Sequence, residues 1–600
     1  MLERMEGTEN ALACLHDEDY DVPFNTQNLN ADTLVFLGGR PTQSLNGDWN
    51  FCVDLLDTGL RQKWHTLTPM PAEERGEPYD YDPYVGETVP VPSCWSMLKE
   101  KWYFFEGSAW YTRPIDFDGL GVDERLFLRV GAAQYDCKVF LNGEFLGNHY
   151  GGSTPFNIDL SSYIKTGRNW LMLVVNNTRT LDRVPMRNTD WFNYGGIYRD
   201  VVLFKTPKTY IKDLFIALEA DDCYDKVNIE VEVAGSSNVP VTVTCPELAI
   251  NVQVALDKHG KGQTQVSCKP ELWSPESPRL YDFQATLGRD TVSDRIGFRQ
   301  IKQVGTELFL NGQSIFLRGI SVHEDDEFKG KVLLDSDLHQ RFEHAKELNC
   351  NFMRFAHYPH DERAAKMADE LGFLLWEEIP VYWAIDFNNP ATLKDAQNQL
   401  KELIKRDRNR ASVIIWSVGN ENPDTDERLA FMRSLVDLAN QMDKTRLTSA
   451  ACLVNHSKNR IEDRLAKFIN VIGINEYYGW YDEKFEDLIE FLDNSDPGKP
   501  VVISETGADG YIGEGKLEKG FFSEAYMAEV YKKQIATLRE REFVKGISPW
   551  ILYDFRVERR QNMFQRGWNR KGLIASDKKT KKQAFHLLSA FYDELKNGLD

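Results

Sequence analysis

The sequence lacks the cysteine patterns that mark a disulfide framework or a structural zinc site. Its nine cysteines are scattered along the chain, and none forms a C-x-x-C pair with another. Their odd number leaves at least one thiol unpaired. We therefore expect a protein of a reducing compartment that binds no metal.

Long apolar runs are missing as well. Charged residues are spread through the first ten positions, where a signal peptide needs an apolar core, and no run of about 18 apolar residues follows. Such runs are what a secretory signal or a membrane-spanning helix requires. The sequence therefore predicts a cytoplasmic protein without a membrane partner.

Positive charge is scarce relative to negative charge. There are 71 Lys and Arg residues against 92 Asp and Glu residues, for a formal net charge of −21. Binding to a nucleic acid needs clustered basic residues that neutralise phosphates, so we expect no nucleic-acid partner. An anionic sugar can still bind if a local positive group works against the overall field.

Short β-rich runs alternate with turn clusters from about residue 34 to residue 204. The segment 137–146 is typical, with apolar residues on both sides of Asn142-Gly143. Asn-Gly turns indicate hairpins, and a rhythm of about 8–12 residues indicates a sandwich or jelly roll. A second strand-rich segment has the length of an immunoglobulin-like sandwich. We expect a jelly-roll domain over 1–206 and an immunoglobulin-like domain over 207–303.

From residue 304 to residue 600 the pattern changes to strand, loop and helix, repeated. No Gly-rich phosphate loop follows the first strand, which argues against a doubly wound sheet. Eight strands separated mostly by helices predict a (β/α)8 TIM barrel. The expected strands are 315–320, 351–355, 372–377, 412–421, 446–451, 471–474, 499–504 and 546–552.

Two of these strands end in a glutamate. The apolar run 413–418 is followed by Gly419, Asn420 and Glu421, and the run 500–504 is followed by Glu505. A carboxylate after a buried strand lies at the rim where barrels place their chemistry. Two such carboxylates facing one cleft are the minimum for glycoside hydrolysis. Either glutamate alone is explained equally well as a strand cap or an ion-pair partner.

Most other strands also end in polar or aromatic residues. His323 and His357 lack the helical spacing of a zinc site, so we expect them to shape a pocket by hydrogen bonding. We expect Glu377 to orient its neighbours and Glu378 to pack near the rim. The Asn569–Lys571 segment, taken alone, is most simply a solvated basic turn.

A set of short segments resembles glycoside hydrolase family 2 from about residue 40 to the C-terminus. The segments are 91–95, 110–113, 190–199, 297–299, 317–320, 354–359, 419–421 and 504–505. The resemblance implies a jelly-roll sugar-binding-like domain, an immunoglobulin-like domain and a catalytic barrel. It also implies hydrolysis with retention of configuration, with Glu421 as acid/base and Glu505 as nucleophile.

Two further segments, 475–481 and 569–573, resemble the β-glucuronidase branch of that family, whose Asn-x-Lys motif binds the sugar carboxylate. This implies substrate contacts from Asp190, His357, Asn420, Tyr477, Tyr481, Trp550, Asn569 and Lys571. The branch usually carries an arginine shortly before this motif. We carry that role over to Arg566, although the segment 557–568 is longer here. The loop 380–394 is short, which predicts an open mouth.

The sequence thus predicts a retaining exo-β-glycosidase that removes terminal β-D-glucuronides without a cofactor. A β-galacturonidase stays open, because the two sugars differ only at C4. A β-galactosidase is disfavoured, because a buried lysine without an anionic partner costs desolvation energy. A carbohydrate-binding protein on an inactive barrel is the non-enzymatic alternative, and the presence of both glutamates argues against it. Association into a homo-oligomer also stays open.

Overall fold

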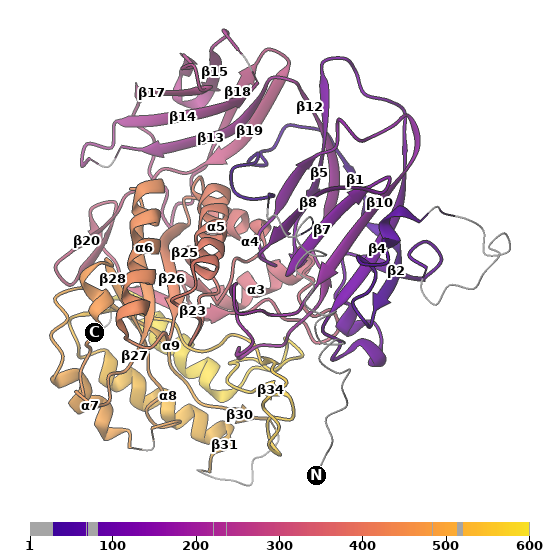
Figure 1. Ribbon diagram of the computed structural model, residues 1–600. Helices are drawn as coiled ribbons and strands as arrows, with labels where there is room; N and C mark the ends of the chain where they lie inside the picture. Colours follow the sequence, from indigo (N-terminus) through magenta and orange to yellow (C-terminus); the bar gives the residue numbers. More distant parts are fainter. Residues whose placement is uncertain are drawn as a thin grey trace, which may run out of the picture.

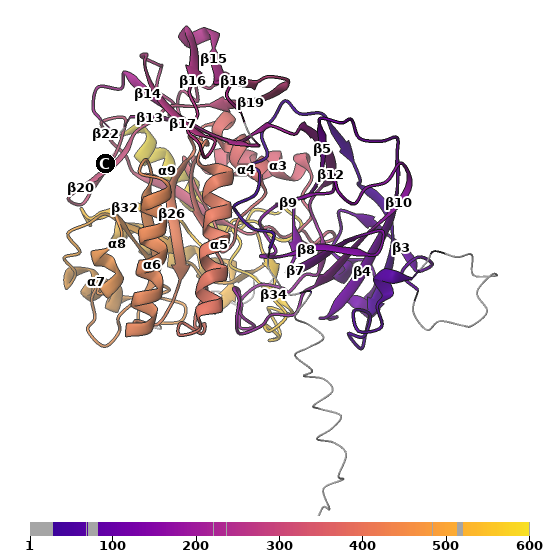
Figure 2. The ribbon, with the colours of Figure 1, turned by 45° about the horizontal axis from the view of Figure 1, so that its top comes forward.

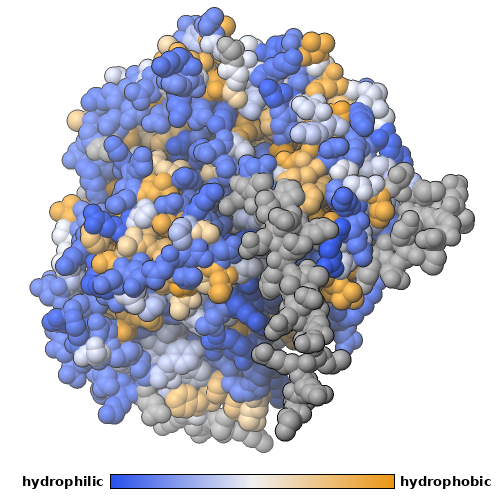
Figure 3. Space-filling view, in the orientation of Figure 1, coloured by the Kyte–Doolittle hydropathy of each residue, from blue (hydrophilic) through white to orange (hydrophobic). Residues whose placement is uncertain are grey.

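The computed structural model describes residues 24, 28–67, 69, 82–219, 221–235, 237–482, 484–512 and 520–598. In Figure 1 the chain passes from a purple β-sandwich through a smaller mauve sandwich to a barrel coloured pink to yellow. Within the described part of the chain, no helix has the length and apolar character to cross a membrane. The face shown in Figure 3 is mostly hydrophilic, with hydrophobic residues scattered among the hydrophilic ones.

The first sandwich packs a six-stranded sheet on a four-stranded sheet. Trp49, Tyr111 and Leu173 from the first sheet and Leu128 and Leu203 from the second share one buried core. The six strands, in spatial order, are β3 (Glu87–Val91), β2 (Gly47–Asp54), β4 (Ser108–Phe117), β10 (Gly167–Asn176), β7 (Asp136–Leu141) and β8 (Glu144–Tyr150). The other four are β1 (Thr42–Ser44), β12 (Val201–Pro207), β5 (Glu124–Val130) and β9 (Phe156–Asp159). The predicted N-terminal sandwich is confirmed.

The second sandwich is the predicted immunoglobulin-like unit, which is also confirmed. Along β14 every second side chain is buried, from Val227 to Val233, as a strand with one face on a core requires. One sheet contains β13 (Tyr210–Leu218), β14 (Lys226–Ala234) and β17 (Lys261–Ser267). The other contains β16 (Ile250–Val254), β15 (Val241–Cys245), β18 (Tyr281–Leu287) and β19 (Asp290–Ile296).

Eight parallel strands close into the predicted barrel. They are β23 (Leu317–Val322), β24 (Phe352–Phe355), β25 (Leu374–Glu378), β26 (Val413–Asn420), β27 (Leu447–Leu453), β28 (Val471–Asn475), β29 (Val501–Glu505) and β32 (Val544–Ile547). All eight residues of β26 are buried, because α5 and α6 cover it outside and the barrel core lies inside (Figure 2). The last strand ends earlier than predicted, and residues 548–552 form a loop at the rim.

Helices surround the barrel between most strands. They are α3 (Asp335–Glu347), α4 (Glu362–Leu371), α5 (Pro390–Asp407), α6 (Asp426–Met442), α7 (Glu486–Asp493), α8 (Glu524–Leu538) and α9 (Gln583–Asn597), with a short 3-10 helix η8 (Arg464–Lys467) between β27 and β28. A small sheet precedes the barrel and consists of β20 (Ile301–Val304), β21 (Glu307–Leu310) and β22 (Gln313–Ser314). Its Leu308 and Leu310 pack against residues at the beginning of the barrel strands, such as Leu317 and Phe352.

Buried ion pairs hold both sandwiches against the barrel. Arg199 of the first sandwich donates to Glu324 at 2.9 Å and to the carbonyl of Pro359 at 3.0 Å. Arg410 of the barrel contacts Asp294 of the second sandwich and Asp369. The segment 177–195, which follows β10, also contacts the barrel, since Trp191 packs against His357 and Tyr382 and Asp190 pairs with Arg560.

Replacing Arg199 with Met should lower the free energy of unfolding by about 3–5 kcal/mol, because Glu324 would remain buried without its partner. The matched control is Arg168→Met, since Arg168 and Asp116 form an ion pair with side chains 57% and 69% exposed. That change should lower the free energy of unfolding much less, because solvent screens an exposed ion pair. Urea unfolding followed by tryptophan fluorescence compares the two, and equal losses would contradict the structural role of Arg199.

Candidate active site

The two predicted glutamates lie at the carboxyl ends of the barrel strands, the end that forms the substrate cleft in barrel enzymes. Glu505 is the last residue of β29, and Glu421 follows β26 directly with a left-handed backbone, φ 52°. Asn475, the last residue of β28, pairs in register with Glu505. Its Nδ2 donates to Glu421 Oε1 at 3.0 Å, so one side chain connects the two carboxylate positions.

Glu505 is buried among hydrogen-bond donors. Arg354 Nη1 donates to its Oε1 at 2.8 Å, and the Tyr477 hydroxyl donates to its Oε2 at 2.6 Å. Burial raises the pKa of Glu505 to about 8, and the charge of Glu421 adds to this, while Arg354 and Tyr477 oppose it. Without its two donors, the group would be harder still to ionise.

Glu421 has a different and less charged environment. Trp383 Nε1 donates to its Oε2 at 2.5 Å, beside the contact from Asn475. Burial raises the pKa of Glu421 as well. Two interacting carboxyl groups with raised pKa values titrate as a pair. Arg354 touches Glu505 alone of the two, which favours the negative charge there and the proton on Glu421.

Arg354 also organises the floor of the cleft. It donates to Glu378 Oε1 at 2.9 Å and to Asn420 Oδ1 at 2.7 Å. Burial would raise the pKa of Glu378, but Arg354 and His357 lower it to about 2. Burial lowers the pKa of His357 to about 4, so its ring is neutral and its Nδ1 donates to Glu378 at 2.9 Å. This ring stacks on Trp550 with centroids 4.8 Å apart.

The expected roles of Glu377 and Glu378 were wrong. Glu378 is the residue that orients its neighbours, through Arg354 and His357. Glu377 interacts instead with Asp407 of α5, and burial raises its pKa well above the ordinary value. Successive strand residues point to opposite faces, so Glu378 faces the interior of the barrel and Glu377 the layer of helices.

A second polar cluster lies next to Glu505. Lys571 Nζ contacts Asp509 Oδ1 at 2.7 Å and the Tyr481 hydroxyl at 3.0 Å. Arg560 Nη2 donates to Asp190 Oδ2 at 2.6 Å and to the Tyr481 hydroxyl at 3.2 Å. The Tyr481 ring lies 5.2 Å from that of Tyr477, which links this cluster to the carboxylate pair.

Lys571 therefore has an anionic partner within the protein. Burial lowers its pKa, but the neighbouring Asp509 outweighs this and raises the pKa above the ordinary value. The desolvation argument against a neutral substrate was wrong, because it assumed that no carboxylate of the chain would reach the lysine. Asp509 lies in the loop after β29, far from Lys571 in sequence, and gave no signal of its own.

The structure leaves Arg566 outside this cluster. Its side chain is exposed, and its Nε donates to the carbonyl of Met563 at 2.7 Å. Arg559 and Arg560 are the arginines beside Asp190, and sequence reasoning missed both. The unusual length of the segment 557–568 was the available signal, because a longer loop moves the arginine along the chain. The other predicted site residues all lie at the cleft or its second cluster: Asp190, His357, Asn420, Glu421, Tyr477, Tyr481, Glu505, Trp550, Asn569 and Lys571.

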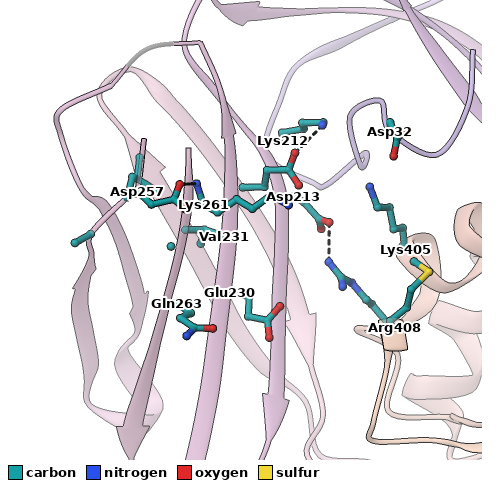
Figure 4. Close-up of a pocket in the computed structure, with 15 residues that line it drawn as sticks. Asp32, Lys212, Asp213, Glu230, Val231, Asp257, Lys261, Gln263, Lys405 and Arg408 are labelled. Atoms are coloured by element: carbon teal, nitrogen blue, oxygen red, sulfur yellow. Dashed lines mark hydrogen bonds and ion pairs between the residues drawn. The ribbon is translucent and has the colours of Figure 1, made fainter. Parts of the chain in front are cut away.

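A pocket of about 850 Å³ lies elsewhere, between the second sandwich and α5 (Figure 4). Two of its cations are already paired, since Lys212 contacts Glu232 and Arg408 contacts Asp213, each at 2.6 Å. Among the described residues, Asp221, Cys223 and Asp225 also lie close enough together to hold a metal ion, in the turn between β13 and β14. Neither feature touches the two carboxylates at the barrel rim.

Two β-sandwiches followed by a closed barrel with paired rim carboxylates define the architecture of a multidomain glycosidase. Family models agree along the chain. Residues 42–207 match "Glycosyl hydrolases family 2, sugar binding domain", residues 209–299 match "Glycosyl hydrolases family 2", and residues 300–597 match "Glycosyl hydrolases family 2, TIM barrel domain". The chain belongs to glycosyl hydrolase family 2.

Within the family the chain is similar to enzymes of one kind. It is 28% identical to a beta-glucuronidase of Paenibacillus borealis over 93% of this chain and 97% of that protein. It is 28% identical to the beta-glucuronidase of Sus scrofa over 92% and 91%. A solved beta-glucuronidase of an uncultured Clostridium sp. has a TM-score of 0.81 at 27% identity, covering 94% of this chain and all of that one. A structure of the Ruminococcus gnavus enzyme in complex with D-glucuronic acid has a TM-score of 0.79 at 26% identity, with the same coverage.

Replacing Tyr477 with Phe should raise the pKa of Glu505 further, because the phenol hydroxyl donates to the ionised carboxylate and stabilises it. Carbon-13 NMR titration of labelled glutamates, assigned by difference with Glu505→Gln, measures the shift. The control is Tyr592→Phe, whose hydroxyl contacts only the carbonyls of Gly319 and Ile547. An unchanged or lower pKa in Tyr477→Phe would contradict the described contact.

Proposed function

We propose that this protein is a retaining exo-β-glucuronidase acting by double displacement. The observation that carries the proposal is the carboxylate pair Glu421 and Glu505 beside the cationic cluster of Lys571 and Arg560. The first part supplies glycosidic bond cleavage, and the second supplies recognition of a sugar carboxylate. The similarity to beta-glucuronidases over nearly the whole chain supports both parts.

In the first step, Glu505 attacks the anomeric carbon while Glu421 gives its proton to the leaving oxygen. Forming the ester removes the negative charge of Glu505. The pKa of Glu421 then falls, because a neighbouring negative charge no longer favours its protonated form. Glu421 can now act as a base toward water, which releases the sugar with retained configuration.

Asn420 is suited to hold the sugar 2-hydroxyl. Its Oδ1 is fixed by Arg354 at 2.7 Å and by Asn475 at 3.0 Å. Its Nδ2 is buried and has no hydrogen-bond partner among the described residues. An unpaired buried donor is costly, and a substrate hydroxyl would remove that cost on binding.

The charge balance of the second cluster favours an anionic sugar. Three cations, Lys571, Arg559 and Arg560, surround two carboxylates, Asp190 and Asp509. One positive charge is left over, in a protein whose overall charge is −21. Salt screens the overall field beyond roughly 8 Å, so the local cations decide binding, and we assign the sugar carboxylate to Lys571 and Arg560, which both contact Tyr481. Asn569 adds a neutral donor beside Asp190.

Glu505→Gln should reduce turnover of p-nitrophenyl β-glucuronide by several orders of magnitude, because the covalent step is lost. Glu377→Gln is the matched control. That glutamate points away from the barrel interior, and burial raises its pKa well above the ordinary value, so an amide of the same shape should leave activity within about threefold of the parent. A folded Glu505→Gln protein within about tenfold of the parent would refute the nucleophile assignment.

Removing the buried pair as a unit tests the recognition of the carboxylate. The double variant Asp509→Asn/Lys571→Met leaves no unpaired charge, so a change in activity reports the lost substrate contact. The efficiency ratio of glucuronide to galactoside should fall by about 30-fold or more, from a cost of roughly 2 kcal/mol upward for one truncated charge pair.

Including the galacturonide in the same panel separates the C4 epimers, since Lys571 contacts only the shared carboxylate. A ratio of glucuronide to galactoside that stays constant in the folded double variant would reduce the assignment to a retaining β-glycosidase of unspecified sugar.

A further inference from the structure

Two consecutive arginines share one carboxylate at the cleft. Arg560 Nη2 contacts Asp190 Oδ2 at 2.6 Å, and Arg559 Nε contacts Asp190 Oδ1 at 3.2 Å. A single carboxylate cannot neutralise both guanidinium groups. Their remaining contacts differ: Arg560 reaches Tyr481 on the side of Lys571, whereas Arg559 lies over the ring of Trp383.

Trp383 marks the side of the cleft from which the leaving group departs. Its Nε1 donates to Glu421 Oε2 at 2.5 Å. A general acid must lie within hydrogen-bond reach of the oxygen that it protonates. A side chain bonded to the carboxyl group of that acid therefore stands next to the departing group rather than next to the carboxylate of the bound sugar.

The ring of Trp383 is held in a fixed place. The backbone N–H of Trp383 donates to the carbonyl of Asn420 at 2.9 Å, and Asn422 Nδ2 donates to the carbonyl of Trp383 at 2.7 Å. Its φ of 54° is in the left-handed region, which is costly for a bulky side chain and occurs most often at functional sites. The short loop 380–394 therefore places the ring of Trp383 beside Glu421.

Arg559 adds a cation to this ring. Its guanidinium carbon lies 4.5 Å from the centroid of the Trp383 ring, and its Nη1 donates to Asn188 Oδ1 at 3.0 Å. A guanidinium stacked on an aromatic ring keeps its edge free to donate to a carboxylate or sulfate. The side chain is 46% exposed, so that edge is open to a ligand.

We propose that Trp383 and Arg559 form a leaving-group subsite that selects a leaving group bearing a carboxylate or a sulfate. The proposal rests on the proposed function, since it concerns the other side of the same glycosidic bond. Arg560 and Lys571 serve the sugar carboxylate, and Arg559 serves an anion on the leaving group. Such a group is found on an acidic aryl alcohol or on an acidic sugar.

The test uses pairs of glucuronides that differ only in the charge of the leaving group. The aryl pair is 4-carboxyphenyl β-glucuronide and its methyl ester. The sugar pair is β-glucuronate linked to a 6-sulfated hexose and to the same hexose without sulfate. Each pair gives a ratio of kcat/KM for the charged over the neutral substrate, and comparing this ratio between proteins cancels the intrinsic difference in leaving ability.

Arg559→Gln should lower this ratio by about 2- to 5-fold, the range of a half-exposed ion pair. A fall in the aryl pair alone assigns acidic aryl alcohols, a fall in the sugar pair alone assigns acidic oligosaccharides, and a fall in both assigns either source. An unchanged ratio in both pairs overturns the proposal. The matched control is Arg433→Gln on α6, since Arg433 also stacks on a ring, 4.7 Å from Phe468, and is 57% exposed. Its ratio should not change.

Two variants of Trp383 separate the support of Arg559 from the contact with Glu421. Trp383→Phe keeps a flat ring and should keep the ratio, but it removes the donor that lowers the pKa of Glu421. The alkaline limb of its pH profile should therefore move to higher pH. Trp383→Leu should lower the ratio and also move the alkaline limb to higher pH, because it removes both the ring and the donor. A ratio that falls as far in Trp383→Phe as in Trp383→Leu would overturn the stacking role.

The outcome for the proposed function can be separated from this result. A parent protein that cleaves none of the glucuronides refutes both proposals. A parent that cleaves them, with the same ratio in the parent and Arg559→Gln, refutes the leaving-group subsite alone.

Discussion

The geometry of the cleft depends on one buried guanidinium. Arg354 is fully enclosed and contacts the carboxylates of Glu378 and Glu505 and the side chain of Asn420. A buried cation is tolerated only when it is paired and hydrogen-bonded, so these groups must converge on it. They come from β25, β29 and β26, while Arg354 itself lies in β24. The arginine thus aligns half of the barrel rim and determines where negative charge is stable.

Much of the architecture could be predicted because local patterns carry it. The apolar run of β26 is buried along its whole length, and its end places Glu421 at the rim. The alternation along β14 identified a sandwich strand in the same way. Strand and helix periods are properties of short segments, so a single sequence reveals them without knowledge of distant contacts. Position at a strand end then predicted which residues meet at one cleft.

The remaining features depend on contacts between distant segments. Asp509 partners Lys571 from another loop, and Asp190 partners Arg560 from another domain. The residues next to Lys571 and Arg560 in the sequence give no sign of these partners. Loop length is a second feature that the local sequence does not explain, because the length of the segment 557–568 decides which arginine reaches the cleft. Adjacent Glu377 and Glu378 illustrate the remaining limit, because a shift of one residue exchanges the inner and outer faces of a strand.

Asp190 belongs to a segment of the first sandwich, yet it is the counter-ion of two arginines from a loop of the barrel. The candidate active site is therefore a composite of two folding units, and the barrel alone does not complete it. Loosening the contact between the units would release that loop while the barrel remained folded. Heat or denaturant can thus inactivate the enzyme before its core melts. In a chimera, the sandwich and the barrel loop would have to be exchanged together.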